Sequence, residues 1–256
     1  AKGTEEVYYL INENNDKMVN YIIRILQLLN NEQPNMILIG KEYVGKELLL
    51  KIALYIMKYN YVEANINLLL NKGIKAFENE TIIKSLQEIA YNNRKIFIIF
   101  PQELFKNASE NDILYILDDI SNLFDINQIL KKFISFLNVA GTEYASVNLT
   151  VDELKCRLQK NLHIVITTNP YNYTYNKIFL NYPKIAARCD VIYIDEYYEN
   201  NLSVLSNVVF DKNDCIISNN LTKMLLDIYN FVKLLYEEFS HKINIDISIN
   251  QRHYLS

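Results

Sequence analysis

The segment from residue 36 to residue 50, MILIGKEYVGKELLL, has the spacing of a phosphate-binding loop but lacks one of its chemical groups. Gly40, Gly45 and Lys46 match the pattern G-x-x-x-x-G-K-[ST]. In that pattern, backbone N–H groups and the lysine hold phosphates, and the final hydroxyl ligates magnesium. The final position here is Glu47. The sequence therefore predicts a phosphate loop without its metal-ligating hydroxyl.

Negative charge in this loop should weaken phosphate binding. Glu47 and Glu42 both bring a carboxylate to the region where phosphate oxygens would lie. At about 5 Å and an effective dielectric constant of about 20, each like-charge pair costs roughly 3 kcal/mol, and Lys41 and Lys46 offset part of it. Two other readings stay open at this point. Glu47 could be a first-turn residue stabilised by its helix dipole, and a single near-match can arise by coincidence.

The acidic residues that P-loop ATPases use are also missing from the end of the expected third strand. Such strand ends carry an aspartate that holds magnesium and a glutamate that polarises the attacking water. Here the apolar run 96–100 is followed by Pro101, Gln102 and Glu103. Proline offers no ligand, the glutamine amide accepts no proton, and one residue of shift would turn Glu103 to the other face. We expect no magnesium binding and no hydrolysis from this strand end.

Alternating strand and helix signals around these motifs predict an α/β fold with a parallel sheet. Strands are expected at residues 37–39, 61–66, 96–100, 162–167 and 190–194. Helices are expected at residues 19–29, 46–57, 81–90, within 111–137, at 151–158 and just before the last strand. After about residue 198 only helical periodicity remains, along Leu221, Leu225, Ile228, Val232 and Leu235. We therefore expect an α/β domain at 1–197 and a small helical domain at 198–256.

Composition excludes several classes of protein. The 26 basic and 30 acidic residues are interspersed and give a net charge of −4, so no basic patch for nucleic acid or an anionic membrane is expected. Apolar runs are short, and the N-terminus lacks the features of a signal peptide, so we expect neither a membrane span nor secretion. The chain begins AKGTEEV without an initiator methionine, which suggests a fragment of a longer protein.

Cysteine and histidine residues give no metal or disulfide signal. They are Cys156, Cys189, Cys215, His163, His241 and His253. No two cysteines form a C-x-x-C pair, which argues against a disulfide framework or a zinc site and fits a reducing compartment. The histidines stand alone, so we interpret them as structural and expect no metal.

Four further segments indicate one family. The fourth strand reads NLHIVITTNP and contains Asn169, and PKIAARCDVIYID places Arg188 before the fifth strand. With DDISNL at 118–123 and YEEF at 236–239, these segments resemble the fourth AAA+ module of a dynein heavy chain, which precedes the coiled-coil stalk. The resemblance covers essentially the whole chain, from VYYL at residue 7 to the end. It departs from the family at the phosphate loop and at the third strand end.

The resemblance implies an AAA+ P-loop domain, with a five-stranded parallel sheet between helices, followed by a small helical lid. It implies that Asn169 is the polar sensor between the γ-phosphate and the attacking water. It also implies that Arg188 is an arginine finger, which would complete the nucleotide site of the preceding module in a ring of six unequal modules. The alternative for Arg188 is an ordinary solvent-exposed or core-edge arginine.

We therefore interpret the chain as a regulatory, hydrolysis-deficient module of an ATP-driven, minus-end-directed microtubule motor. ATP or ADP would bind weakly or not at all, without magnesium. The resemblance implies as partners the neighbouring modules of the same heavy chain, other dynein subunits and, through the stalk, the microtubule. It implies a location on the cytoplasmic cytoskeleton, with the ciliary axoneme left open. One alternative is an active ATPase in which Glu47 or Glu103 supplies the missing carboxylate. Another is a free-standing interaction protein on an inactive P-loop scaffold.

Overall fold

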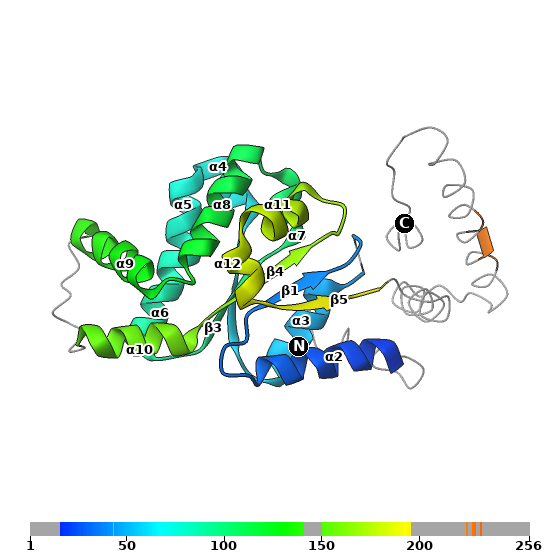
Figure 1. Ribbon diagram of the computed structural model, residues 1–256, viewed down its shortest axis with the longest axis horizontal. Helices are drawn as coiled ribbons and strands as arrows, with labels where there is room; N and C mark the ends of the chain where they lie inside the picture. Colours follow the sequence, from blue (N-terminus) through cyan, green and yellow to red (C-terminus); the bar gives the residue numbers. More distant parts are fainter. Residues whose placement is uncertain are drawn as a thin grey trace, which may run out of the picture. The chain divides into compact units, whose positions relative to one another are not determined.

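The computed structural model describes residues 16–42, 44–140 and 150–195, together with four single helical residues, Met224, Asp227, Ile228 and Phe231 (Figure 1). One compact unit comprises residues 22–40 and 46–194, and the remaining described residues belong to a second unit. The boundary expected at residues 197 and 198 lies outside the described residues, as do Cys215, His241 and His253. Of the expected C-terminal helical face, only Ile228 is described, so the small helical domain stays a prediction.

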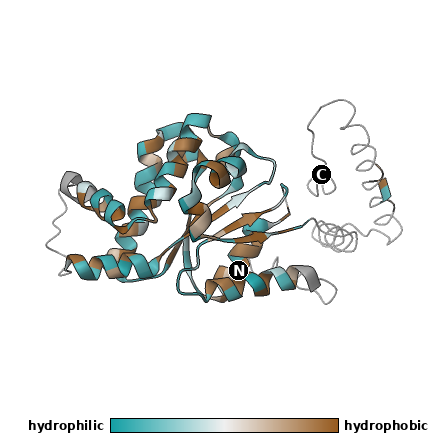
Figure 2. Ribbon diagram, in the orientation of Figure 1, coloured by the Kyte–Doolittle hydropathy of each residue, from teal (hydrophilic) through white to brown (hydrophobic). Residues whose placement is uncertain are grey.

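The larger unit is built on a five-stranded sheet, in which every described strand pair is parallel, as predicted. The strands are β1 (Met36–Ile39), β2 (Asn60–Glu63), β3 (Ile96–Phe100), β4 (Leu162–Thr168) and β5 (Asp190–Tyr193). Their order across the sheet is β2-β3-β4-β1-β5. The three inner strands are buried along their whole length, which explains their continuous apolar runs. Figure 2 shows hydrophobic residues concentrated in these strands.

Helices cover both faces of the sheet (Figure 1). They are α2 (Asp16–Leu29), α3 (Lys46–Ile56), α4 (Ile66–Lys72), α5 (Ile74–Glu78), the π-helix η1 (Asn79–Ile83), α6 (Lys84–Asn92), α7 (Gln102–Asn107), α8 (Glu110–Asn122), α9 (Ile126–Ala140), α10 (Val151–Asn161), α11 (Tyr173–Asn181) and α12 (Pro183–Arg188). None of the helices in the described part of the chain combines the length and apolar content needed to cross a bilayer.

One expected boundary was wrong for a local reason. The second strand ends at Glu63, and Ile66 begins α4, because the Asn65 side chain accepts a hydrogen bond from the Asn67 amide at 2.8 Å and caps a helix there. The helical patterns expected within 111–137 are confirmed as two helices, α8 and α9. Asp125 separates them, since its carboxylate accepts the Asn127 amide at 3.0 Å and starts α9.

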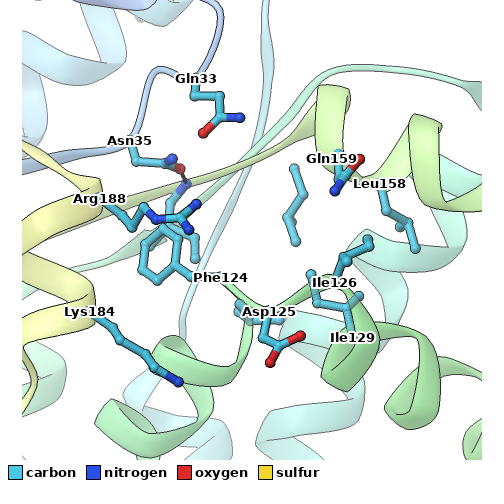
Figure 3. Close-up of a pocket in the computed structure, with 13 residues that line it drawn as sticks. Gln33, Asn35, Phe124, Asp125, Ile126, Ile129, Leu158, Gln159, Lys184 and Arg188 are labelled. Carbon is cyan, nitrogen blue, oxygen red and sulfur yellow. Dashed lines mark hydrogen bonds between the residues drawn. The ribbon is translucent and has the colours of Figure 1, made fainter.

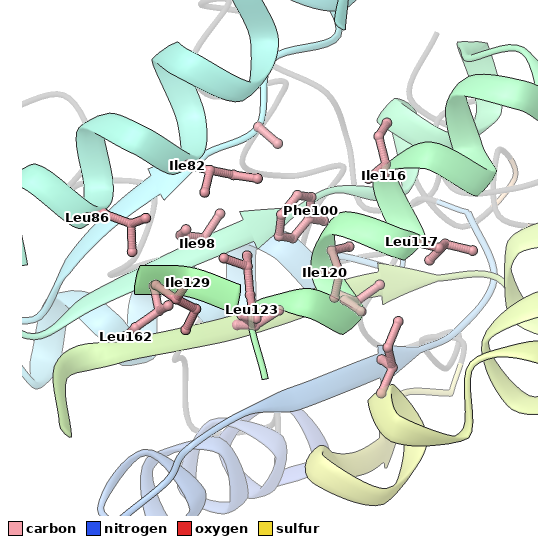
Figure 4. Packing of buried hydrophobic residues seen from close by; sticks show 14 of the residues in the cluster. Ile82, Leu86, Ile98, Phe100, Ile116, Leu117, Ile120, Leu123, Ile129 and Leu162 are labelled. Atoms are coloured by element: carbon pink, nitrogen blue, oxygen red, sulfur yellow. The ribbon is translucent and has the colours of Figure 1, made fainter. Parts of the chain in front are cut away.

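A single apolar cluster joins one face of the sheet to the helices above it. Figure 4 shows Ile98 and Phe100 of β3 and Leu162 of β4 clustered with residues of η1, α6, α8 and α9. Phe100, Leu86 and Leu117 are fully buried in this cluster. Burial of apolar side chains on this scale fixes the sheet, and with it the positions of the strand ends that carry the site.

The other face of the sheet carries a stack of rings around a buried histidine. His163 lies opposite Phe97 in the β3–β4 register, with ring centroids 5.0 Å apart, and Tyr59 stacks on Phe97 at 5.5 Å. His163 is 0% exposed, and neither ring nitrogen has a hydrogen-bond partner among the described residues. Burial, assisted by the charge of Lys95, lowers the His163 pKa from 6.5 to about 3. The imidazole is therefore neutral at physiological pH.

Replacing His163 with phenylalanine should make the protein less sensitive to acid. Between pH about 3 and 6.5, His163 binds more protons in the unfolded chain than in the folded protein. The unfolding free energy of the wild type therefore decreases as the pH falls below 6.5. The loss is at most about 1.4 kcal/mol per pH unit. From pH about 6.5 to about 5, wild type should lose up to about 2 kcal/mol more unfolding free energy than His163→Phe in urea titrations.

The matched control for this measurement is Tyr59→Phe. It alters the same ring stack but removes no group that titrates in this range, so its acid sensitivity should equal that of wild type. Equal losses of stability in wild type and His163→Phe would show that His163 does not carry the effect.

Candidate functional site

The carboxyl ends of the parallel strands bring the loop and the sensor position to one edge of the sheet. Gly40 follows β1, and its amide donates to the Thr168 carbonyl of β4 at 3.1 Å. Asn169 comes next along the chain. Gly45 precedes α3 with φ of +78°, a left-handed conformation that favours glycine. The second glycine of the motif is therefore required by the backbone that leads into α3.

Lys46 occupies the first turn of α3 and is almost completely buried, with 1% of its surface exposed. Its ammonium donates to the Gly40 carbonyl at 2.7 Å. A buried charge needs such a hydrogen bond to offset its loss of hydration. The lysine is therefore held beside the two ends of the loop, where the motif requires a cation, with its ammonium directed at the backbone of Gly40.

Glu47 points its carboxylate at β4. The Thr167 hydroxyl donates a hydrogen bond to this carboxylate. The same hydroxyl oxygen accepts a hydrogen bond from the backbone N–H of Gln102 at 2.7 Å. A fully buried hydroxyl thus joins α3, β4 and the start of α7. Apart from its being a polar residue inside an apolar strand, nothing in the sequence indicates this role for Thr167. At the position where the motif has a metal-ligating hydroxyl, this chain has a carboxylate bonded to a neighbouring strand.

After the end of β3, the side-chain amide of Gln102 is buried and the carboxylate of Glu103 is exposed to solvent. Pro101 is buried and leads into α7 in extended conformation. Gln102 is 6% exposed, and its side-chain oxygen is buried without a hydrogen-bond partner among the described residues. Glu103 is exposed. The buried group at this strand end is therefore an amide, which cannot act as a general base, and the carboxylate lies on the outer side of α7.

Asn169 lies at the same sheet edge as the loop but uses its side-chain oxygen locally. It is half-buried, and its Oδ1 accepts the Tyr171 amide at 3.0 Å. This contact forms a turn immediately after β4 and fixes the direction of the side chain. Within the described residues, no group of three or more histidine, cysteine, aspartate or glutamate side chains lies close enough together to hold a metal ion.

Arg188 lies at the opposite edge of the sheet from the loop. It ends α12 just before β5, and Asp190 at the start of β5 pairs with Met36 at the start of β1, whereas the loop follows Ile39. At about 3.3 Å per residue, the strand separates the two by roughly 10 Å or more. Arg188 is exposed and forms no ion pair or side-chain hydrogen bond with the described part of the chain. Arg188 is therefore placed at the sheet edge away from the strand end that leads into the chain's own loop.

Comparison with known proteins gives one family and one fold. A family model described as P-loop containing dynein motor region D4 matches residues 15–256. The solved S. cerevisiae Hsp104:casein complex in its extended conformation is similar, with a TM-score of 0.55 and 15% sequence identity. The similarity covers 86% of this chain and 34% of the Hsp104 chain, so this chain spans about a third of that protein. No curated protein sequence matches significantly. The predicted fold class, an AAA+ P-loop domain, is confirmed.

The hydroxyl group of Thr167 should contribute more to the unfolding free energy than its methyl group does. Thr167→Val keeps the shape but leaves the buried Gln102 amide without an acceptor and the Glu47 carboxylate without a donor. Such a change costs about 1–3 kcal/mol of unfolding free energy, measurable by chemical denaturation. Thr167→Ser retains the hydroxyl and should keep most of the stability. A serine variant as unstable as the valine variant would assign the effect to packing instead.

Proposed function

Because the chain belongs to the family described as the P-loop containing dynein motor region D4, we propose that it is a regulatory AAA+ module that does not hydrolyse ATP itself. The resemblance to a dynein module expected from the sequence is thereby confirmed. The loss of hydrolysis and the part played in the whole motor are our proposal. The observation that carries it is the hydrogen bond between Glu47 and Thr167 at the position of the metal-ligating hydroxyl.

The residues of this site fit phosphate better than they fit magnesium. Lys46 and the N-terminal end of α3 supply a cation and backbone N–H groups, the elements that hold phosphates in AAA+ P-loop domains, which usually bind nucleotide. Bound ATP or ADP would supply the phosphate charge that Lys46 meets. For magnesium, the site has neither the hydroxyl ligand, which Glu47 replaces, nor an acidic ligand at the end of β3, where Pro101 stands. We therefore propose weak, magnesium-independent binding of ATP or ADP, or none.

Arg188 supports a role toward a neighbouring module. Its position at the sheet edge away from the loop, its exposure and its lack of a partner within the described residues leave the guanidinium available to another chain segment. An arginine finger needs only to reach a neighbour's γ-phosphate, so this role survives the loss of the chain's own chemistry. We propose that Arg188 serves the preceding module of the ring.

In this proposal the module is a mechanical relay. It transmits the nucleotide state of the preceding module toward the stalk, and so acts on the microtubule indirectly. Its partners are the neighbouring AAA+ modules of the same heavy chain and other dynein subunits. The cytoplasmic cytoskeleton is the proposed location.

The geometry argues against the active-ATPase alternative. Glu103 is exposed on α7, and Glu47 is engaged by Thr167, so neither carboxylate is placed to activate a water beside the loop. The family match argues against a free-standing interaction protein. Steady-state phosphate release by the purified chain separates the active from the inactive alternative.

Millimolar MgATP should raise the thermal midpoint of this chain little or not at all. The physical reason is that Glu47 replaces the hydroxyl ligand, Pro101 offers no ligand at the end of β3, and Glu42 adds negative charge to the loop, so magnesium adds no binding energy. Differential scanning fluorimetry with MgATP, and with ATP plus EDTA, should give the same small shift. A shift of many degrees that requires magnesium and disappears in Lys46→Ala would contradict the proposal.

Arg188→Ala should slow ATP turnover at the preceding module when introduced into the complete motor. Loss of an arginine finger lowers the rate constant by about 10³–10⁵-fold in well-studied P-loop NTPases. Turnover is measured by phosphate release, with microtubule-release kinetics as a second readout. Arg188→Lys, which keeps the charge but not the planar fork, should recover only part of the rate. Wild-type turnover in Arg188→Ala would remove the finger from the proposal.

A further inference from the structure

Four cations stand along the amino ends of three neighbouring strands. Lys58 precedes β2, Arg94 and Lys95 precede β3, and Lys160 precedes β4. Because the strands are parallel, all of these strand starts lie at one edge of the sheet. The fold thus brings together charges from three segments that are far apart in the sequence. We call these four residues the basic row.

The strand register places three members of the basic row side by side. The first residues of β2, β3 and β4 are paired with one another across the sheet. Lys58, Arg94 and Lys160 each stand two residues before one of these paired positions. At about 4.8 Å between neighbouring strands, the three backbone positions span roughly 10 Å.

Local contacts hold the segments of the basic row in place. The Asn161 side-chain amide donates a hydrogen bond to Asn93 Oδ1 at 2.9 Å, which joins the end of α10 to the turn before β3. The Lys95 ammonium lies 4.9 Å from the centre of the Tyr59 ring, which joins that turn to the start of β2. The backbone of the row is therefore ordered before any partner binds.

No carboxylate of the described residues pairs with the basic row. None of its four members forms an ion pair with the described part of the chain. Residues 57–60, 92–95 and 156–161 contain no aspartate or glutamate. The acids nearest along the chain have other partners: Glu63 pairs with Lys51 at 2.7 Å, Glu88 accepts the Asn92 side-chain amide at 2.7 Å, and Glu153 accepts the Thr150 backbone N–H at 2.8 Å.

The charges of the basic row also act on one another. Lys58, Arg94 and Lys160 are exposed, and Lys95 is partly buried. Burial lowers the pKa of Lys95, and the nearby charge of Lys160 lowers it further. Both effects disfavour the charged ammonium, whereas a negative charge beside the row would favour it.

Lys58 stands at a position where the backbone favours glycine. It follows α3 with φ of +55°, in the left-handed region that side chains other than glycine adopt less readily. Helices often end with a glycine in this conformation. The turn itself therefore does not require a lysine here.

The basic row is a surface separate from the cavity at the same sheet edge. That cavity has a volume of about 390 Å³ (Figure 3). Gln159, the neighbour of Lys160, lines it on one side, and Figure 3 shows Lys184 and Arg188 on the other. No member of the basic row lines the cavity. The row thus involves neither Arg188 nor the phosphate loop.

We propose that the basic row is a docking surface for an acidic polypeptide segment of a partner, whose aspartate or glutamate carboxylates pair with the exposed cations. The spacing supports a polypeptide. Neighbouring positions of the row are about 5 Å apart, and side chains four residues apart on a helix have Cβ atoms about 5–6 Å apart. A phosphate site instead directs several donors at one group, commonly from backbone N–H groups. The row presents single charges in a line.

The test uses the complete dynein motor and a photo-reactive, alanine-based peptide that carries three glutamates four residues apart. A matched peptide has glutamines in their place. Mass spectrometry should locate the crosslinks of the glutamate peptide within residues 57–61, 91–95 or 156–161. The glutamine peptide should crosslink there with a yield lower by about fivefold or more.

The double variant Lys58→Gly, Lys160→Gln should lower the crosslink yield of the glutamate peptide by about fivefold or more. Lys75→Gln is the matched control, because Lys75 is an exposed lysine on α5 outside the row, and its yield should equal that of wild type. Lys58→Gly alone should not lower the thermal midpoint of the purified chain, because glycine adopts a positive φ readily. A loss of crosslinking then reports lost charge and not unfolding.

Several results would overturn this inference. They are equal yields from the two peptides, crosslinks only outside these segments, a wild-type yield in the double variant, or an equal loss in Lys75→Gln. Stronger competition by a single-stranded oligonucleotide than by unlabelled glutamate peptide would also overturn it, because that result would assign the row to phosphate. None of these outcomes bears on the proposed function, which depends on Arg188 and the phosphate loop.

Discussion

The hydrogen bonds of the Thr167 hydroxyl hold together the edge of the sheet where the site lies. This buried group donates to Glu47 of α3 and accepts the amide of Gln102 at the start of α7. The buried Thr167 hydroxyl needs both partners to complete its hydrogen bonds. It therefore holds the Glu47 carboxylate of α3 against β4. The same contact gives Glu47 a structural role at a position where the motif calls for a metal ligand.

The length of the parallel strands separates the two edges of the sheet to which we assign roles. The loop, Thr167 and Asn169 lie at the carboxyl ends of the strands, whereas Arg188 and the basic row lie at the amino ends. The two edges share the buried strands β1 and β4. Changes at the loop can therefore accumulate without disturbing the surface that we propose meets the preceding module. In our proposal, this separation lets the module lack its own hydrolysis and still serve the preceding module.

The sequence predicted the inner strands well and the local turns poorly. β1, β3 and β4 are continuous apolar runs, which is the pattern of strands buried on both faces. The helices α4, α5 and α7 were missed because they are short, and the cap at Asn65 that ends β2 is a local hydrogen bond. Gly45 and Lys46 could be placed from spacing alone. The role of Thr167 could not, because its partners lie 120 and 65 residues away along the chain.

We expect that this site does not cleave ATP, because Glu47 is hydrogen-bonded to Thr167 and the end of β3 carries the Gln102 side-chain amide in place of a carboxylate. Single-turnover chemistry tests it most directly, with the purified chain in excess over γ-labelled ATP and magnesium present. The account predicts labelled phosphate at the rate of the buffer blank. Release of one phosphate per ATP at a rate well above the blank, abolished by Lys46→Ala, would contradict it.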